Sequence, residues 1–266
     1  MKLTGGLDAT VSTSSNASAV NKTMLVVRSL SKQSRLSDIA SDTGLPASTV
    51  HRILSELVDL GWALQTDDRK YIPGARLLGL SRVVMEEGEY SRIALPVLRP
   101  LAEQTGYTVH FALLQQYEIV YVLKLDGSGA YRMKSRVGNS VHLHTTAIGK
   151  AILASMSSSQ IEAIIARTGL PSVTERSIST EGELHARLAI IRQRGWSEDD
   201  GENDQNVRCV AAVVRGASGR GIGGVSLSGL SFDLSSSRMT ELSPLVIEAA
   251  DRLSALHGYI TTRSRK

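Results

Sequence analysis

The sequence predicts an α+β protein of two domains: a small N-terminal domain built mostly of helices, and a larger domain in which helices cover an antiparallel sheet. Its 266 residues exceed the roughly 150 that are typical of one domain. Residues 20–74 show short segments with helical apolar spacing, followed by a hairpin pattern. Residues 107–262 instead alternate β-type runs with helical segments, and this order is typical of an antiparallel layered domain.

Composition narrows the class of protein. Cys209 is the only cysteine, so no intrachain disulfide can form, which is typical of a reducing cytosol. No apolar run approaches the ~18 residues of a membrane span, and the N-terminus lacks the basic and apolar blocks of a signal peptide. Residues 1–18 are expected to form an unstructured arm. We therefore expect a cytoplasmic protein, whose net charge of +4 is compatible with a polyanionic partner.

Residues 19–80 carry the pattern of a winged helix-turn-helix. Ser37 can cap a short helix that ends at Gly44, where a left-handed residue allows a tight turn. Pro46 opens a second helix, and Gly61 ends it. An apolar stripe at helical spacing marks the buried face of this second helix; it comprises Val50, Ile53, Leu54 and Leu57. A short hairpin around Asp67-Asp68 follows as the wing.

The opposite face of the second helix has the composition of a DNA-reading surface. It offers hydrogen-bonding side chains and one cation, as a helix in the major groove requires. Cations at the hairpin tip can touch phosphates. We therefore predict double-stranded DNA as a partner, contacted by Ser37, Ser48, Thr49, His51, Arg52, Arg69 and Lys70. A protein-interaction module is the alternative, because a polar helix face does not identify DNA by itself.

Residues 81–100 are expected to form a helical linker region between the domains. A helix over about residues 75–88 should join them and help the protein to dimerise through an apolar row, namely Leu77, Leu78, Leu80, Val83 and Val84. Residues 101–262 then form the second domain. It opens with two β-type runs that flank Gln116-Tyr117 and predict a hairpin.

The rest of the second domain alternates helices and strands. A helix, a serine-rich break and a second helix starting near Ser158 or Ser159 are expected first, followed by a helix that Gly195 ends. Two strands over residues 207–216 and 221–230 flank a glycine-rich turn. The terminal helix should kink at Pro244, or restart there with Ser243 as its N-cap.

Two glycine-containing segments resemble nucleotide-binding motifs, but their context argues against that function. The segment "GRGIGG" at residues 219–224 fits the dinucleotide fingerprint, yet a β-type run follows it where that motif requires a helix, so we expect a hairpin turn. The segment "AIGKA" lacks the earlier glycine of a phosphate loop and the Ser or Thr after its lysine. Lys150 is therefore expected to be exposed or paired with an acid.

Other reactive side chains also lack the partners that catalysis needs. His142 and His144 could share one side of a strand, but Zn²⁺ needs three or four ligands, and His110 and Asp199 are the only further candidates. We expect no metal or cofactor, with a metal site as the minor alternative. Ser226 and Ser228 share a strand face without an oriented base, which suits hydrogen bonding to a ligand. Cys209 could be an ordinary small core residue.

The motifs together resemble one known family. "RLSDIASDTGLPASTVHRILSELVDLGW" is followed in order by "YIPGARLLGL", "HLHTTAIGKAILA", "GWSEDDGE", "VRCVAA" and "GGVSLSG". In this order and spacing they resemble the IclR family of bacterial transcriptional regulators, over about residues 20–260. The resemblance implies a winged helix, a linker helix, and a C-terminal effector-binding domain with a GAF/PAS-like fold. It also implies homodimers, often paired into tetramers, on palindromic operators, and we expect a ligand-responsive repressor rather than an enzyme.

The resemblance further implies an effector site in the second domain. Matching the motifs residue by residue assigns the effector to Ala147, Ile148, Asp199, Cys209, Ser226 and Ser228. The resemblance also implies a small organic or aromatic acid as the effector, and backbone N–H groups at a helix start after Thr146 would suit its carboxylate. A metal-dependent sensor or an enzyme built on this domain is the alternative.

The sequence departs from the family pattern at four places. Gly201 stands where one of two adjacent glutamates is usual, and Asn206, which can also adopt the left-handed conformation, replaces a glycine. Val213 replaces a proline, and Ile148 is bulkier than the residue that some members carry. These departures concern the identity of the ligand more than the architecture.

Overall fold

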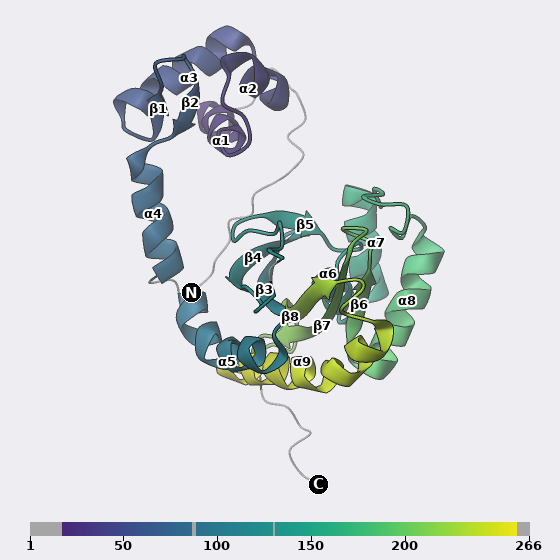
Figure 1. Cartoon of the computed structure of the whole chain (residues 1–266). Coiled ribbons are helices and arrows are strands. Elements are labelled where there is room, and N and C mark those ends of the chain that lie inside the picture. Colours follow the sequence, from purple (N-terminus) through teal and green to yellow (C-terminus); the bar gives the residue numbers. More distant parts are fainter. Residues whose placement is uncertain (1–17, 87–88, 130, 260–266) are drawn as a thin grey trace. The chain divides into compact units, whose positions relative to one another are not determined.

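The computed structural model describes residues 18–86, 89–129 and 131–259, the side chains of residues 81–91 excepted. The chain divides after residue 88 into two compact units (Figure 1). The predicted N-terminal arm lies outside the described residues apart from Ser18, which caps the first helix by accepting a hydrogen bond from the Asn21 N–H at 3.2 Å. Among the described helices, none combines the length and the apolar character that a membrane span needs.

The N-terminal unit is the predicted winged helix-turn-helix. Its elements are α1 (Ala19–Ser29), α2 (Leu36–Thr43), α3 (Ala47–Asp59), β1 (Ala63–Gln65), β2 (Tyr71–Pro73) and α4 (Ala75–Glu86). Gly44 ends α2 in the left-handed conformation, with a φ of 66°, as the sequence predicts. The predicted role of Ser37 as the N-cap is wrong. Helix α2 begins at Leu36, one residue before Ser37, so Ser37 lies inside it and its hydroxyl donates to the adjacent Asp38 carboxylate.

The apolar stripe of α3 forms the core of this unit, as predicted. Val50, Ile53, Leu54 and Leu57 are all buried, and they cluster with Val26, Leu30, Ile39 and Tyr71. The hairpin pairs β1 with β2 in antiparallel register, Gln65 opposite Tyr71. Since α3 turns its apolar stripe inward, its polar face is left to solvent.

The C-terminal unit is built on a six-stranded antiparallel sheet with the strand order β5-β4-β3-β8-β7-β6 (Figure 1). The strands are β3 (Thr108–Gln115), β4 (Glu118–Leu125), β5 (Ser140–His142), β6 (Ser197–Asp200), β7 (Val207–Arg215) and β8 (Gly221–Leu230). The two predicted hairpins, β3–β4 and β7–β8, are confirmed. The edge strands β5 and β6 were not predicted, because three or four residues are too few to show an alternating pattern.

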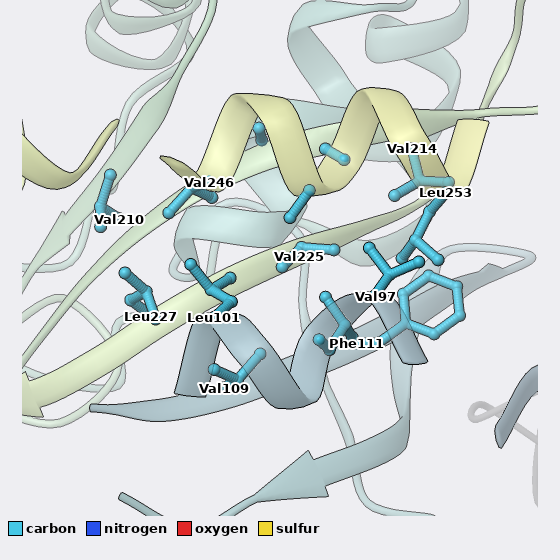
Figure 2. Close-up of a cluster of buried hydrophobic side chains, with 14 of the residues drawn as sticks. Val97, Leu101, Val109, Phe111, Val210, Val214, Val225, Leu227, Val246 and Leu253 are labelled. Atoms are coloured by element: carbon cyan, nitrogen blue, oxygen red, sulfur yellow. The ribbon is translucent and has the colours of Figure 1, made fainter. Parts of the chain in front are cut away.

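Alternation along the central strands sends two different sets of side chains to the two faces of the sheet. One face is covered by α5 (Glu89–Thr105) and α9 (Ser236–Leu256). Figure 2 shows Val97 and Leu101 of α5, and Val246 and Leu253 of α9, packed against Phe111 and the strand valines. The residues in between, such as His110 on β3 and Ser226 on β8, point to the opposite face.

The opposite face carries α6 (Ala147–Ala154), with α7 (Ser158–Thr168) and α8 (Glu181–Arg194) beyond it. Helix α6 lies very close to its surroundings at two glycines. A Cβ placed on Gly149 would overlap the backbone of Leu143, and a Cβ on Gly224 of β8 would lie 2.8 Å from the Ile148 Cγ2 atom. The glycine of the Gly149-Lys150 pair is therefore required by packing, as is common where two backbones approach.

Helix α9 differs from the prediction at Pro244. The helix runs without interruption from Ser236 to Leu256 and is capped by Ser235, so the predicted restart with Ser243 as the N-cap is wrong. Proline lacks the N–H that would donate to the Thr240 carbonyl four residues earlier. The Ser243 hydroxyl donates to that carbonyl at 2.9 Å instead, so the acceptor keeps a partner.

Substituting Gly149 tests the close approach of α6. We expect Gly149→Ala to lower the free energy of unfolding of the larger unit by at least about 2 kcal/mol, because the backbone of Leu143 cannot give way as a side chain can. Gly182→Ala is the matched control: Gly182 lies in α8 with open space around it, and alanine there should stabilise by about 0.5–1 kcal/mol. Urea unfolding followed through Trp196 in a Trp62→Phe background measures both. Equal effects of the two substitutions would contradict the proposed contact.

Candidate functional site

The C-terminal unit encloses a cavity of about 280 Å³ between the start of α6 and the sheet. The six residues that the sequence assigns to an effector site all line it: Ala147, Ile148, Asp199, Cys209, Ser226 and Ser228. They come from α6 and from three adjacent strands, so the fold brings together positions up to about eighty residues apart. The cavity also has walls that the sequence did not predict, among them His110, Tyr121 and Ser135.

One wall of the cavity is the first turn of α6. Thr146 caps this helix by accepting a hydrogen bond from the Gly149 N–H at 3.2 Å, and its hydroxyl donates to the His142 carbonyl at 3.0 Å. Thr146, Ala147 and Ile148 face the cavity. Unpaired N–H groups of a first helical turn carry partial positive charge, so this wall favours an anion.

A second wall is a row of polar side chains that crosses the sheet. Asp199 on β6 lies opposite Cys209 on β7, which in turn lies opposite Ser228 on β8. Two residues further along β8, Ser226 lies opposite His110 on β3. The antiparallel register therefore aligns residues that the sequence shows only as separate alternating runs. Asp199 lies on the edge strand β6, which the sequence did not predict.

His110 holds a central place in this row. Its Nε2 atom lies 2.7 Å from the Ser135 hydroxyl, and its Nδ1 atom lies 3.3 Å from the Ser228 hydroxyl. Burial lowers the pKa of His110 to about 3, so the imidazole is neutral at neutral pH. The signal that could have revealed this residue is a histidine on the inward face of a strand whose other face is wholly apolar.

Lys150 is fully buried beside the cavity and forms an ion pair with Glu202. Of the two expectations for this lysine, pairing with an acid is therefore confirmed and exposure is wrong. Burial raises the pKa of Glu202, and the positive charge of Lys150 opposes that shift. Because both charges lie out of water, each depends on the other for compensation.

Asp199 is the other buried carboxyl of this cluster. Its Oδ1 atom accepts a hydrogen bond from the Glu202 N–H at 2.7 Å. Burial raises the pKa of Asp199 to about 7; the negative charge of Glu202 adds to the rise, and Lys150 opposes it. An acid with a pKa near neutrality can either donate or accept a hydrogen bond, depending on its protonation.

The histidine pair is not part of this cavity. The His142 and His144 rings lie 5.6 Å apart, and the Nε2 atom of His144 lies 3.0 Å from the Pro171 carbonyl oxygen. His144 follows the end of β5 and is buried, which lowers its pKa. Within the described part of the chain, no group of three or more His, Cys, Asp or Glu side chains is placed to hold a metal ion.

Two further glycine-rich segments have the local structure that their context indicates. The first two residues of "GRGIGG" lie in the turn between β7 and β8, with Gly219 left-handed at a φ of 79°, and the other four begin β8, so the predicted hairpin is confirmed. In the loop between β6 and β7, Gly201 adopts the left-handed conformation with a φ of 80°, whereas Asn206 does not. The substitution of Asn206 for a glycine therefore needs no special backbone conformation.

The polar face of α3 is open to solvent. Ser48, His51 and Arg52 are exposed, and Thr49 is half-buried. Arg52 forms an exposed ion pair with Glu56 one turn later, at 3.1 Å. At the wing, Arg69 is exposed in the left-handed conformation, and Lys70 lies 2.6 Å from Asp68. Exposed pairs of this kind contribute little, so a phosphate or a base can displace them.

A winged helix with an exposed polar recognition face, joined in one chain to a domain that encloses a small polar-lined cavity, is typical of a transcriptional regulator. Residues 19–67 match the IclR helix-turn-helix domain, and residues 84–255 match the family described as "Bacterial transcriptional regulator IclR C-terminal". The chain belongs to the IclR family of transcriptional regulators, which bind DNA and are not enzymes, and the enzyme alternative is therefore set aside.

Relatives and solved structures agree with this assignment. The chain is 30% identical to "Transcriptional repressor IclR" of Escherichia coli over 226 residues, which cover 84% of this chain and 82% of that protein. It is 29% identical to the regulator KdgR of E. coli, with coverage of 92% and 94%. The crystal structure of Thermotoga maritima IclR is similar with a TM-score of 0.71 and 28% identity, over 90% of this chain and 98% of that one.

Removing Lys150 tests the buried ion pair. We expect Lys150→Met to destabilise the larger unit by about 3–5 kcal/mol at pH 8, because two carboxylates are then buried without a cation. Their pKa values in the folded state then rise further above the unfolded values. The folded state therefore keeps protons that the unfolded state releases. The loss in free energy of unfolding that Lys150→Met causes should consequently become smaller as the pH falls. Urea unfolding at pH 5 and pH 8 measures this difference. Adding Glu202→Gln to Lys150→Met should recover part of the lost free energy of unfolding. A loss that is equal at both pH values would contradict the Lys150–Glu202 ion pair.

Proposed function

We propose that this protein is a transcriptional repressor whose affinity for DNA is controlled by a small organic acid bound in the C-terminal cavity. One observation carries the proposal. The N–H groups of a helix start, two serine hydroxyls and the Asp199 carboxyl, whose pKa is raised to about 7, all face the same cavity. Repressor function is supported by the relatives named "Transcriptional repressor IclR" and "Acetate operon repressor". A structural neighbour from Microbacterium hydrocarbonoxydans, 21% identical with a TM-score of 0.73, is described as complexed with 4-hydroxybenzoate.

The cavity favours a compact acid. Its volume of about 280 Å³ lies below the usual range for sites that hold drug-sized molecules. A carboxylate at the first turn of α6 would accept hydrogen bonds from the backbone N–H groups of Ala147 and Ile148. Ser226 and Ser228 would donate to it or to a second polar group of the acid. The Ile148 side chain, packed on Gly224, limits the width of the ligand on this side.

DNA recognition is proposed for the winged helix. Ser48, Thr49, His51 and Arg52 would enter the major groove, while Ser37, Arg69 and Lys70 would contact the backbone. We propose a homodimer or a dimer of dimers on a palindromic operator, with a contact that includes α4, where Leu78 and Leu80 are exposed. Val83 and Val84 lie outside the residues whose side chains are described. Binding of chromosomal DNA in turn implies a cytoplasmic location.

Control by the effector requires a difference in affinity. The acid changes DNA binding only if it binds one arrangement of the two winged helices better than another. The same coupling makes DNA change the affinity for the acid by an equal factor. Weaker binding of the acid to the DNA-bound protein is therefore the expected signature of a repressor that an acid releases.

Arg52 tests the DNA-reading face. Arg52→Ala should weaken operator binding by about 1–3 kcal/mol, or about 5- to 150-fold, if the guanidinium makes a bidentate contact to guanine. Glu56→Ala is the matched control, because it frees Arg52 from its ion pair and removes a negative charge from the same face. It should leave affinity unchanged or increase it. Gel shifts at constant salt, on the DNA upstream of the protein's own gene, measure both. Unchanged binding by Arg52→Ala would remove Arg52 from the recognition set.

Ser228 tests the effector cavity. Ser228→Ala should raise the acid concentration needed for half-release of DNA by about 2- to 13-fold, the effect of one lost hydrogen bond of about 0.5–1.5 kcal/mol. Candidate acids are first selected by their thermal shift of the wild-type protein. Ser172→Ala, an exposed serine outside the cavity, is the control. An unaltered response in Ser228→Ala, with normal DNA binding in the absence of acid, would place the effector elsewhere.

A further inference from the structure

One positive charge serves two buried carboxyl groups beside the cavity. Lys150, Glu202 and Asp199 are exposed by only 0%, 5% and 2%. The ammonium group of Lys150 forms its ion pair with Glu202, and no ion pair joins it to Asp199. Asp199 instead accepts backbone hydrogen bonds from the loop that carries Glu202. Asp199 faces the cavity, so it is the carboxyl of the two that a ligand meets.

The other titratable groups around Asp199 are neutral near pH 7 or already paired. Burial raises the pKa of the Cys209 thiol on β7 and of the Tyr121 phenol on β4, with the charge of Asp199 adding to both shifts. His110 on β3 is neutral because burial lowers its pKa. Lys134 is the one lysine or arginine among the described residues that line the cavity; its side chain is 83% exposed, and its ammonium group lies 3.8 Å from the Asp204 carboxylate, which lines the cavity as well. This pair brings no net positive charge to a second anion, and its cation is solvated rather than buried beside Asp199.

An acid bound as a carboxylate would add a second negative charge next to Asp199. Two carboxylates that share a site do not both stay ionised, and one retains a proton. A protonated Asp199 would donate an O–H hydrogen bond to a carboxylate, whereas an ionised one would repel it. Glu202 and Lys150 act as positioning residues here: Glu202 occupies the lysine, so the lysine is not free to neutralise the ligand.

We propose that the cavity takes up a carboxylate together with one proton, held between Asp199 and the ligand, so that acids bind more weakly as the pH rises above neutrality. This inference rests on the proposed function, because it assumes that the ligand of the cavity is a carboxylic acid. The proton comes from solvent and remains on the Asp199–ligand pair. The release of DNA by the regulator would consequently depend on intracellular pH as well as on the concentration of the acid.

The first experiment needs no ligand. In the wild type, the folded state holds a proton on Asp199 that the unfolded chain releases above about pH 4. The unfolding equilibrium constant of the larger unit should therefore rise with pH relative to Asp199→Asn, by up to about tenfold per unit between pH 4 and pH 7. Asp200→Asn is the matched control: it is the adjacent aspartate on β6, paired with Arg176 and Arg208 outside the cavity. Coincident profiles of the wild type and Asp199→Asn would overturn the inference.

The second experiment measures proton uptake on binding. Acetate, pyruvate, benzoate and 4-hydroxybenzoate are titrated into the full-length protein by calorimetry, in pairs of buffers with different heats of ionisation. For an acid that binds, uptake should approach one proton per ligand at pH 8.5, with affinity falling toward tenfold per pH unit above about pH 7. Asp199→Asn should bind without proton uptake and without this pH dependence, while Asp200→Asn should keep both.

The outcomes separate this inference from the proposed function. If an acid binds the wild type with the same affinity at pH 6 and pH 8.5, the inference that Asp199 and the ligand share a proton is wrong. The proposal that the cavity binds an acid is then unaffected. If none of the four acids binds at any pH, they are removed as effectors, and the ligand-free unfolding profile still decides whether Asp199 holds a proton. Proton uptake that persists in Asp199→Asn would assign the proton to another group and overturn the inference.

Discussion

The close contact of α6 with the sheet is the constraint on which the C-terminal unit depends. Gly149 lets the start of α6 lie directly against the Leu143 backbone, and Gly224 leaves the space on β8 into which the Ile148 side chain packs. This contact brings the first turn of α6, whose first N–H groups have no acceptor within the helix backbone, next to the polar residues of the sheet. A larger residue at either place would move the helix away and open the cavity to solvent, where the same N–H groups would bind water instead of a ligand.

Burial of the Lys150–Glu202 pair follows from the same contact. Lys150 comes directly after Gly149, and the close packing of α6 leaves its side chain fully out of water. A buried ion pair rarely contributes to stability, because desolvation offsets the attraction between its charges. Its value here is positional. The pair holds Glu202, and the backbone N–H of Glu202 donates a hydrogen bond to Asp199. The carboxyl that faces the cavity is thus oriented by a charge pair that lies behind it.

The N-terminal unit follows a different physical logic. Its core comes from one apolar stripe on α3 and its neighbours, and the recognition face takes no part in that core. Arg52 and Lys70 form exposed ion pairs, which are weak. Phosphate can therefore replace the carboxylate partner of either cation. Stability and DNA recognition therefore rest on opposite faces of the same helix, and the residues of one face can vary without loss of the other.

Local pattern was sufficient to predict most helices and the two main hairpins. Periodicity shows which face of an element is apolar, so the α3 stripe and the shared face of Ser226 and Ser228 could be read directly. Periodicity does not show which charged residues form ion pairs with one another. The burial of Lys150, the place of Asp199 on an edge strand and the entry of His110 into the cavity depend on strand register and on contacts between residues far apart in the chain. The sequence by itself determined most of the elements, their apolar faces and the family. Only the tertiary structure decided how the charges pair, because pairing is set by the distance between side chains in space and not by their spacing in the sequence.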